Sequence, residues 1–376
     1  MIDFSGTKIS FSIGSFEDFI DNGSLDLLKL NEYSGNKMPE FEMIFNVTNP
    51  QILNVLNETN ILKISMGLTE LKIDTEMIIY HKTIDIKNSQ EYNVHAFGML
   101  GNSDYLLIPR RRVFGNQTTD GIGVSGYNIL AIVIKENFAN ADSNMEASSD
   151  QMVRVQCNES NKAFVDHLMA TMYTPNTFTM CGITIFGKFK FREIRTLSQT
   201  EPSWNFTPGA KDEKDIEYKN DFMIDDQSGV MNYLYGYTTQ RVFWDSDSGY
   251  KYMSQSGNTT MLAMCEGFNR GDVTKFLPQM ATNANMYNGY WQATMDQMSY
   301  WALFSSVSLQ LRFEGWKNVE ILDLVNVIQQ IDNKDKDPSN ENISGLYLIS
   351  SVSRVFERNS IVTYVTLNRE SLNCIE

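Results

Sequence analysis

The chain has 376 residues, a net charge of −15 and 42% hydrophobic residues. A length above roughly 250–300 residues favours two or three domains, and the composition is that of a globular protein. The acidic balance argues against a general nucleic-acid binder, because such proteins need a basic surface. It would suit a surface past which DNA slides, since negative charge repels phosphates.

Signals for export, membrane insertion or disulfide formation are missing from the sequence. The segment MIDFSGTKIS has neither the basic nor the apolar region of a secretory signal, and the apolar run at 129–134 is too short for a membrane span. We therefore expect a soluble protein made in a cytoplasm. The four cysteines are far apart, without a C-x-x-C motif, and we expect buried free thiols: Cys157, Cys181, Cys265 and Cys374.

Residues 1–112 have the pattern of one β-rich domain. Thr48 or Asn49 can cap a short helix, and Pro50 suits its first turn. Apolar residues at every second position predict strands on both sides of that helix. These predicted strands cover residues 24–35, 41–47, 61–67, 71–86 and 91–100.

Residues 113–200 mix helical and extended patterns. Ser125 can cap a helix over 126–138, and the spacing of Phe164, Leu168 and Met172 predicts another over 161–173. A short strand is expected at 154–160 and a hairpin or bent strand at 181–194.

Residues 201–290 are the least regular. The charge run at 211–226 predicts a solvated loop or a sheet edge. Further along, a stripe of large side chains at roughly helical spacing indicates either core or a subunit interface. Its members are Tyr287, Trp291, Met295, Met298 and Trp301.

The last stretch, residues 305–369, alternates apolar and polar residues over most of its length. Strands are predicted at 305–313, 321–328, 344–356 and 361–370, with a charged loop at 333–342. The stretch contains no nucleophile–base pair and no metal-ligand spacing. It is therefore typical of a structural β module.

A glycine pattern at Gly121, Gly123 and Gly126 fits G-x-G-x-x-G letter for letter. That motif binds dinucleotides only after a buried strand, where the glycines bring a helix N-terminus to the pyrophosphate. The preceding RRRVFGNQTTD is polar and rich in turn formers. We interpret the pattern as a flexible loop that leads into a helix.

Two groups of potential metal ligands occur. Asp245 and Asp247 alternate as in a calcium loop, but the third ligand and the distal glutamate are missing, and an Asp-rich β-turn is the simpler interpretation. His81 and His95 lie on neighbouring predicted strands, with His167 elsewhere, and no third ligand is evident. Because H-E-x-x-H, G-x-S-x-G and P-loop motifs are also missing, we predict no catalytic, cofactor-binding or metal-binding residues.

Two basic clusters stand out in this acidic chain. Lys188, Lys190 and Arg192 alternate with Phe189 and Phe191, so the cations share one face of a strand that meets solvent or an acidic neighbour. A second cluster, residues 110–112, consists of three arginines. It suits ion pairing between subunits or a contact at a domain junction, and weak DNA contact is a further alternative.

The pattern SLQLRFEGW…ILDLVNVI…SGLYLISSVSRVF…YVTLNRE resembles the closing module of baseplate hub proteins from contractile-tail phages and related injection systems. Ser344-Gly345 with Tyr347, and Thr366-Leu367 with Arg369, match that module. The chain departs from it where Leu322 replaces the usual glycine before Asp323. The segment 30–67 is similar to the hub's first barrel. Residues 161–194 are similar to the helix-then-strand unit between the barrels.

The resemblance implies a mainly β protein with two antiparallel β-barrel domains and a mixed α/β region. The first barrel would cover 1–112 and the second, discontinuous barrel 201–238 with 301–376. The mixed region would comprise 113–200 and 239–300.

The resemblance also implies a structural, non-enzymatic homotrimer in the virion's tail baseplate, assembled in the host cytoplasm. Its pseudo-six-fold ring would join the hexameric tail tube to the trimeric central spike and let DNA or the tape-measure protein pass. Baseplate wedge components would be further partners, and no cofactor and no specific nucleic-acid binding are implied.

Two alternatives remain open from the sequence. A tail-associated cell-wall hydrolase would need a catalytic domain, which the sequence does not offer. A calcium- or carbohydrate-binding β protein would use Asp245, Asp247 and surface aromatic residues as its site.

Overall fold

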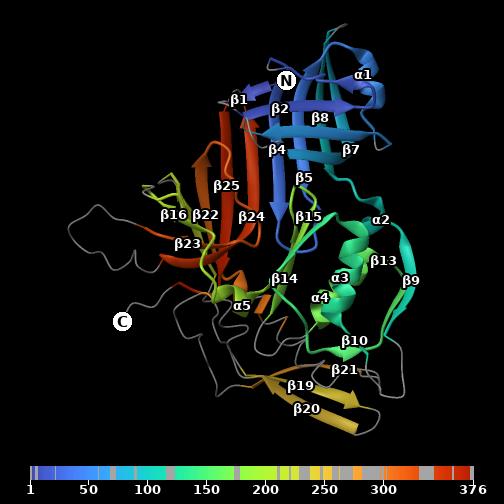
Figure 1. The fold of residues 1–376 in the computed structure, drawn as a ribbon, viewed down its shortest axis with the longest axis vertical. Helices are drawn as coiled ribbons and strands as arrows, with labels where there is room; N and C mark the ends of the chain where they lie inside the picture. The colour runs from blue at the N-terminus through green and yellow to red at the C-terminus, as the bar shows by residue number, and fades with distance from the viewer. Residues whose placement is uncertain are drawn as a thin grey trace, which may run out of the picture.

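The computed structural model shows a mainly β protein with a small helical region (Figure 1). Within the part of the chain described here, no helix is long and apolar enough to cross a membrane. The structure describes residues 2–4, 7–21, 23–57, 59–67, 73–88, 91–115, 123–172, 178–209, 212–219, 222–227, 238–245, 249–255, 262, 274–281, 297, 300–301, 303–329, 343–357 and 360–372.

The N-terminal strands form one end of a long sheet, at the top of Figure 1, in the order β1-β2-β6-β7-β8-β5-β4. Asn49 caps the intervening helix by accepting from the Gln51 N–H, and Pro50 occupies its first turn, as predicted. The elements are β1 (Ile2–Phe4), β2 (Thr7–Ile13), β3 (Phe16–Glu17), β4 (Leu25–Tyr33), β5 (Glu40–Val47), α1 (Pro50–Val55), β6 (Ile61–Gly67), β7 (Ile73–Asn88) and β8 (Glu91–Leu100).

The middle region packs two helices beside a small sheet of order β11-β15-β14. Ser125 and Ser160 cap these helices through their side-chain oxygens, because each accepts from a backbone N–H in the first turn. The elements are α2 (Ser103–Leu106), β9 (Pro109–Phe114), β10 (Val124–Ser125), α3 (Gly126–Asn137), β11 (Asn140–Ser143), β12 (Gln151–Met152), β13 (Arg154–Ser160), α4 (Asn161–Thr171), β14 (Thr179–Ile183), β15 (Lys188–Glu193) and α5 (Ile194–Ser198).

The C-terminal strands complete the long sheet. β22 pairs with β25, β25 with β24, and β24 with β4 of the N-terminal half, all antiparallel. The elements are β16 (Trp204–Thr207), β17 (Asp215–Glu217), β18 (Met223–Asp226), β22 (Val307–Glu314), β23 (Leu324–Val327), β24 (Gly345–Glu357) and β25 (Ser360–Arg369). A separate sheet of β19 (Thr238–Asp245), β20 (Gly249–Gln255) and β21 (Thr274–Ala281) lies at the bottom of Figure 1.

Alternation at period two explains the sheet's two faces. In β5 and β22 every second side chain is buried, including Phe41, Phe45, Leu309 and Phe313. One apolar cluster joins the N-terminal strands to α3, α4 and β15, and a second lies among the C-terminal strands.

Sheet pairing is continuous between the two predicted barrel domains, 1–112 and 201–238 with 301–376. The pairing of β4 with β24 joins residues 27–33 to residues 351–357. Among the described residues, the strand pairings close no ring, so the two barrels and their boundaries stay predictions. The charge run at 211–226 does form sheet edges, since β17 pairs with β16 and β18 with β22.

Two local predictions were wrong. The strand predicted at 321–328 begins only at Leu324, because Ile321 and Leu322 form a turn. Cys157 is exposed rather than buried, since its side chain points outward from β13. Cys181 is buried as predicted, and burial raises the pKa of its thiol to about 12. Cys265 and Cys374 lie outside the described residues.

Candidate functional site

The two strand histidines are neighbours but do not form a metal site. His95 Nε2 lies 2.8 Å from Glu42 Oε1. The Phe97 ring contacts both imidazoles, with its centroid 4.2 Å from that of His95 and 5.8 Å from that of His81. His167 is on α4, away from this pair. Throughout the described ranges, no three His, Cys, Asp or Glu side chains gather as metal ligands would.

The helix that follows the glycine pattern already holds a carboxylate at its N-terminus. The Gly126 N–H donates to Asp150 Oδ2 at 3.0 Å, and Asp150 forms a buried ion pair with Arg154. This carboxylate takes the position at which a helix N-terminus would bind phosphate. The strand before Gly126 has only two residues, Val124–Ser125. The geometry therefore supports a loop that leads into a helix, while Gly121 lies outside the described residues.

The calcium hypothesis concerns residues at the end of β19. β19 ends at Asp245, which is the register partner of Gly249 at the start of β20. Asp247 lies outside the described residues, so the hypothesis is not tested there.

The basic strand β15 meets an acidic neighbour. Lys188 Nζ lies 2.9 Å and Lys190 Nζ 3.1 Å from Glu320 Oε2, and Lys190 also pairs with Asp323. The Lys190 side chain is only 1% exposed, and Phe189 and Phe191 are buried on the opposite face. Of the two predicted surroundings, the acidic neighbour is confirmed. We call these four charged residues the ionic junction, because they join the middle region to the C-terminal strands.

Two carboxylates that β15 meets, Glu320 and Asp142, have lowered pKa values. Burial alone would raise the pKa of Glu320, but attraction to Lys190 and hydrogen bonds from both lysines together outweigh it and lower the pKa. Asp142 accepts from Arg192 at 2.6 Å, and this bond lowers the pKa of Asp142. These carboxylates stay charged at neutral pH, which suits cross-linking of structure rather than acid–base catalysis.

The turn that carries Asp323 has the geometry expected for a glycine. Leu322 has φ +60°, in the left-handed region, although its side chain is fully buried. Its N–H donates to the Ile349 carbonyl at 2.8 Å, and the Ile349 N–H donates to the Asp323 carbonyl at 3.1 Å. The turn therefore keeps its shape without glycine and places Asp323 beside Lys190, at a cost in backbone strain.

Another buried ion pair, Glu32 with Arg354, spans the pairing of β4 with β24. Both side chains are 0% exposed. Arg354 also donates to the Val319 carbonyl at 2.6 Å and lies 4.6 Å from the centre of the Trp316 ring. Burial raises the pKa of Glu32, and Arg354 only partly opposes that effect.

Our sequence reasoning missed this pair. A signal was present in the pattern, because Glu32 follows Leu28 and Leu30 on a buried face and Arg354 lies between Val352 and Phe356 on another. What the pattern could not show is that residues 322 positions apart in the chain face each other.

One face of the long sheet is half-exposed and polar over many strands. Its members alternate with the buried side chains and neighbour one another through the strand register. They include Lys29, Glu42, Thr83, His95, Arg312, Ser353 and Tyr364. Such a mixed face suits contact with other macromolecules better than it suits a reaction.

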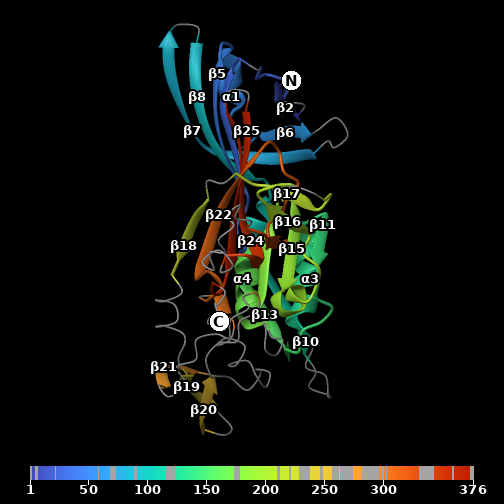
Figure 2. The ribbon, with the colours of Figure 1, turned by 90° about the vertical axis from the view of Figure 1, so that its left-hand side faces the viewer.

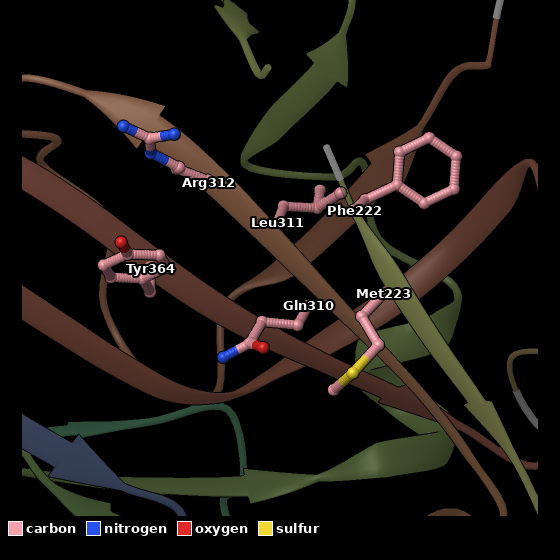
Figure 3. Close-up of a pocket in the computed structure, with 6 residues that line it drawn as sticks. All are labelled: Phe222, Met223, Gln310, Leu311, Arg312 and Tyr364. Carbon is pink, nitrogen blue, oxygen red and sulfur yellow. The ribbon is translucent and has the colours of Figure 1, made fainter. Parts of the chain in front are cut away.

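A pocket of about 370 Å³ opens on this face between β18, β22 and β25 (Figure 3). Arg312 and Tyr364 are register partners, and so are Met223 and Gln310. The pocket offers hydrogen-bond donors and apolar side chains but no nucleophile–base pair. Its lining residues are Phe222, Met223, Gln310, Leu311, Arg312 and Tyr364.

The arginine cluster divides between two environments. Arg112 turns inward and donates to Gln156 at 2.9 Å, Glu136 at 2.6 Å and Asn161 at 2.7 Å. Arg110 and Arg111 are exposed on β9. Arg112 therefore makes a contact within the middle region, and the other two arginines are available to a partner.

Only part of the predicted aromatic stripe is described. Trp301 is 41% exposed and donates through its indole N–H to the Thr179 carbonyl at 3.2 Å. Its neighbour Tyr300 is buried and stacks on Phe178. This end of the stripe packs on the middle region, while Tyr287, Trp291, Met295 and Met298 lie outside the described residues.

Comparison with known proteins gives matches in structure but not in sequence. No protein-family model matches the chain, and no curated protein matches it significantly. A tail protein from Neisseria meningitidis MC58 superposes with a TM-score of 0.60 at 9% identity, over 96% of both chains. The 43 kDa tail protein of prophage MuSo2 from Shewanella oneidensis gives a TM-score of 0.58 at 10% identity, over 96% of this chain and 97% of the other.

A third match comes from a secretion system. An Escherichia coli component of the type VI secretion system, itself described as similar to the T4 phage tail proteins gp27 and gp5, gives a TM-score of 0.51 at 9% identity. The match covers 96% of this chain and 77% of the other. At these identities the comparisons establish the fold. The chain therefore has the fold that these tail proteins and this secretion-system component share, which agrees at the level of fold with the resemblance seen in the sequence.

Proposed function

We propose that this protein is a structural hub of a contractile-tail baseplate, in a phage virion or a related injection system. The observation that carries the proposal is the extent of the structural match, which covers 96% of this chain and 96–97% of two tail proteins, one of them from a prophage. A match over the whole chain leaves little of it for an added catalytic domain. The role follows from the architecture rather than from any single residue.

In this role three copies form a ring that joins the hexameric tail tube to the trimeric spike. Two barrels per subunit would give the ring six similar units, which reconciles three-fold and six-fold partners. The net charge of −15 supports a central passage for DNA or the tape-measure protein, because a negative wall repels phosphates. Spike, tube, tape-measure and wedge proteins are thus the proposed partners, and the tail baseplate is the proposed location.

The proposed role includes no catalysis. The buried charged clusters of the described residues are paired within the chain, as in the ionic junction and the pair Glu32–Arg354. Paired, buried ions hold structural elements together and are poorly placed to meet a substrate. Purified protein that clears peptidoglycan would contradict this part of the proposal.

The test is assembly on a spike. The purified protein, alone and co-expressed with a trimeric phage spike protein, is examined by mass measurement and by electron-microscopic class averages. We expect three copies of the 43.0 kDa chain, about 129 kDa, in a three-fold ring with a central hole. A strict monomer in both preparations at about 10 μM would contradict the hub.

A further inference from the structure

Strand β9 presents an exposed strip that is both basic and apolar. Arg110 and Arg111 are exposed, and Val113 is 64% exposed. Val155, the register partner of Val113 on β13, is 54% exposed and enlarges the apolar part. Leu107, just before the strand, is 74% exposed. Contiguous exposed apolar side chains beside unusual charge mark a contact surface.

Strand β18 presents the complementary strip. Its Met223 is 61% exposed, and Asp225 and Asp226 are exposed as well. Within the described part of the chain, β18 pairs only with β22, and β9 pairs only with β13. Each strand therefore has one sheet edge at which another strand can pair.

The two strips match in order as well as in charge. Antiparallel pairing that sets Arg111 opposite Asp225 also sets Val113 opposite Met223 and Arg110 opposite Asp226. Opposite charges and apolar side chains directly across a strand pair both stabilise the pairing. The exposed strips of one chain thus contain both halves of a contact.

We propose that β9 of one copy of this chain pairs antiparallel with β18 of the next copy. The two strands lie on different flanks of the subunit. β9 is at the right-hand edge of Figure 1, whereas β22, the partner of β18, is on the left, and Figure 2 shows β18 at the sheet's outer margin. A contact between two different patches is heterologous, and it closes into a ring when the rotation allows. The inference rests on the proposed function, whose trimer it supplies with an interface.

The first test reverses charges. Arg111→Asp and Asp225→Arg are each expected to weaken self-assembly at least about tenfold, measured as the concentration at half-assembly. Combining both substitutions in one chain restores an opposite-charge pair and should recover most of the loss. Lys63→Asp is the matched control, because Lys63 is 59% exposed on β6, away from both strips, and it should leave assembly unchanged.

The second test is a covalent cross-link between copies. In a Cys157→Ser background, Val113→Cys combined with Met223→Cys should give disulfide-linked species on a non-reducing gel. The largest of these species should be a trimer. Either cysteine alone should give none. Cross-linked species require the two positions to meet in different copies.

The outcomes separate this contact from the hub itself. A normal trimer that tolerates Arg111→Asp and gives no cross-link would overturn the contact and leave the hub standing. A wild-type chain that stays monomeric, with and without spike, would overturn both. Loss of DNA retention in Arg111→Asp with intact assembly would overturn the contact and assign the arginines to nucleic acid.

Discussion

The N-terminal strands and the middle region are attached to the C-terminal strands in different ways. The N-terminal strands attach through the backbone ladder between β4 and β24, with one fully buried ion pair inside it. The middle region attaches through side chains, by an apolar cluster that includes Ile194 and Leu324 and by the ionic junction of Lys188, Lys190, Glu320 and Asp323. The hydrogen bonds of a backbone ladder do not depend on the charge of side chains, whereas a junction built from charges depends on pH and salt.

The largest expected effect is at the buried pair in the β4–β24 ladder. Arg354→Met leaves the Glu32 carboxylate buried without its partner, and we expect a loss of about 3–5 kcal/mol in the free energy of unfolding, measured by urea denaturation. The double variant Glu32→Leu with Arg354→Met removes both charges and should recover most of that loss. If the double variant is as unstable as the single one, the loss comes from packing around Trp316 and not from charge.

The ionic junction should respond strongly at one lysine and weakly at the other. Lys190 is 1% exposed and Lys188 is 32% exposed, although both reach Glu320. We expect Lys190→Met to lower the free energy of unfolding by about 2–4 kcal/mol, because it leaves two mostly buried carboxylates without this cation. Lys188→Met, the matched control, should cost about 1 kcal/mol or less, since its pair is partly solvated. Equal losses in urea denaturation would show that burial does not set the strength of this junction.

Elements with regular alternation could be predicted from the sequence, and the contacts between them could not. β5 and β22 follow period two over their whole length and β25 follows it as far as Leu367, and α3 is capped by Ser125 as the pattern indicated. The sequence left open whether Lys190 meets solvent or an acidic neighbour, because the turn that carries Asp323 is 133 residues away in the chain. Pairing partners depend on tertiary geometry, which local periodicity does not encode.

The position of the turn at Leu322 could be predicted from the sequence, but its backbone conformation could not. The departure from the hub pattern marked the position, and the structure shows that leucine adopts the conformation favoured by glycine. Burial of the side chain explains how this is tolerated: a fully buried leucine contributes about 2 kcal/mol, more than the strain of about 1–2 kcal/mol. Local propensity was thus overridden by packing.

Substitution of Leu322 separates these two contributions. Leu322→Ala loses the packing and keeps the strain, so we expect a loss of about 2–4 kcal/mol. Leu322→Gly loses the packing and relieves the strain, and it should be at least as stable as the alanine variant. Leu324, equally buried in β23, is the control, because there glycine should be about 1 kcal/mol less stable than alanine. If the alanine variant is more stable than the glycine variant at both positions, the backbone of Leu322 is not strained.

The smallest effect is a difference in how the two attachments respond to pH. The pKa of Glu320 lies below its ordinary value of 4.5, so the unfolded chain takes up its proton more readily than the folded one. Its contribution to stability is therefore complete above about pH 4.5 and is lost as the pH falls through the lower folded value. The pKa of Glu32 is raised, so its contribution has the opposite sign and is lost as the pH rises from 4.5 through the folded value.

Glutamine variants at the two positions should therefore tilt the pH profile in opposite directions. Measured as urea midpoints from about pH 7 down to about pH 3, Glu320→Gln should flatten the acid loss of stability, and Glu32→Gln should steepen it. The readout is the slope with pH rather than the overall stability, so a general loss of packing cannot imitate it. Parallel slopes for the two variants would mean that both attachments respond to acid alike. The contrast between a backbone ladder and an ionic junction would then be lost.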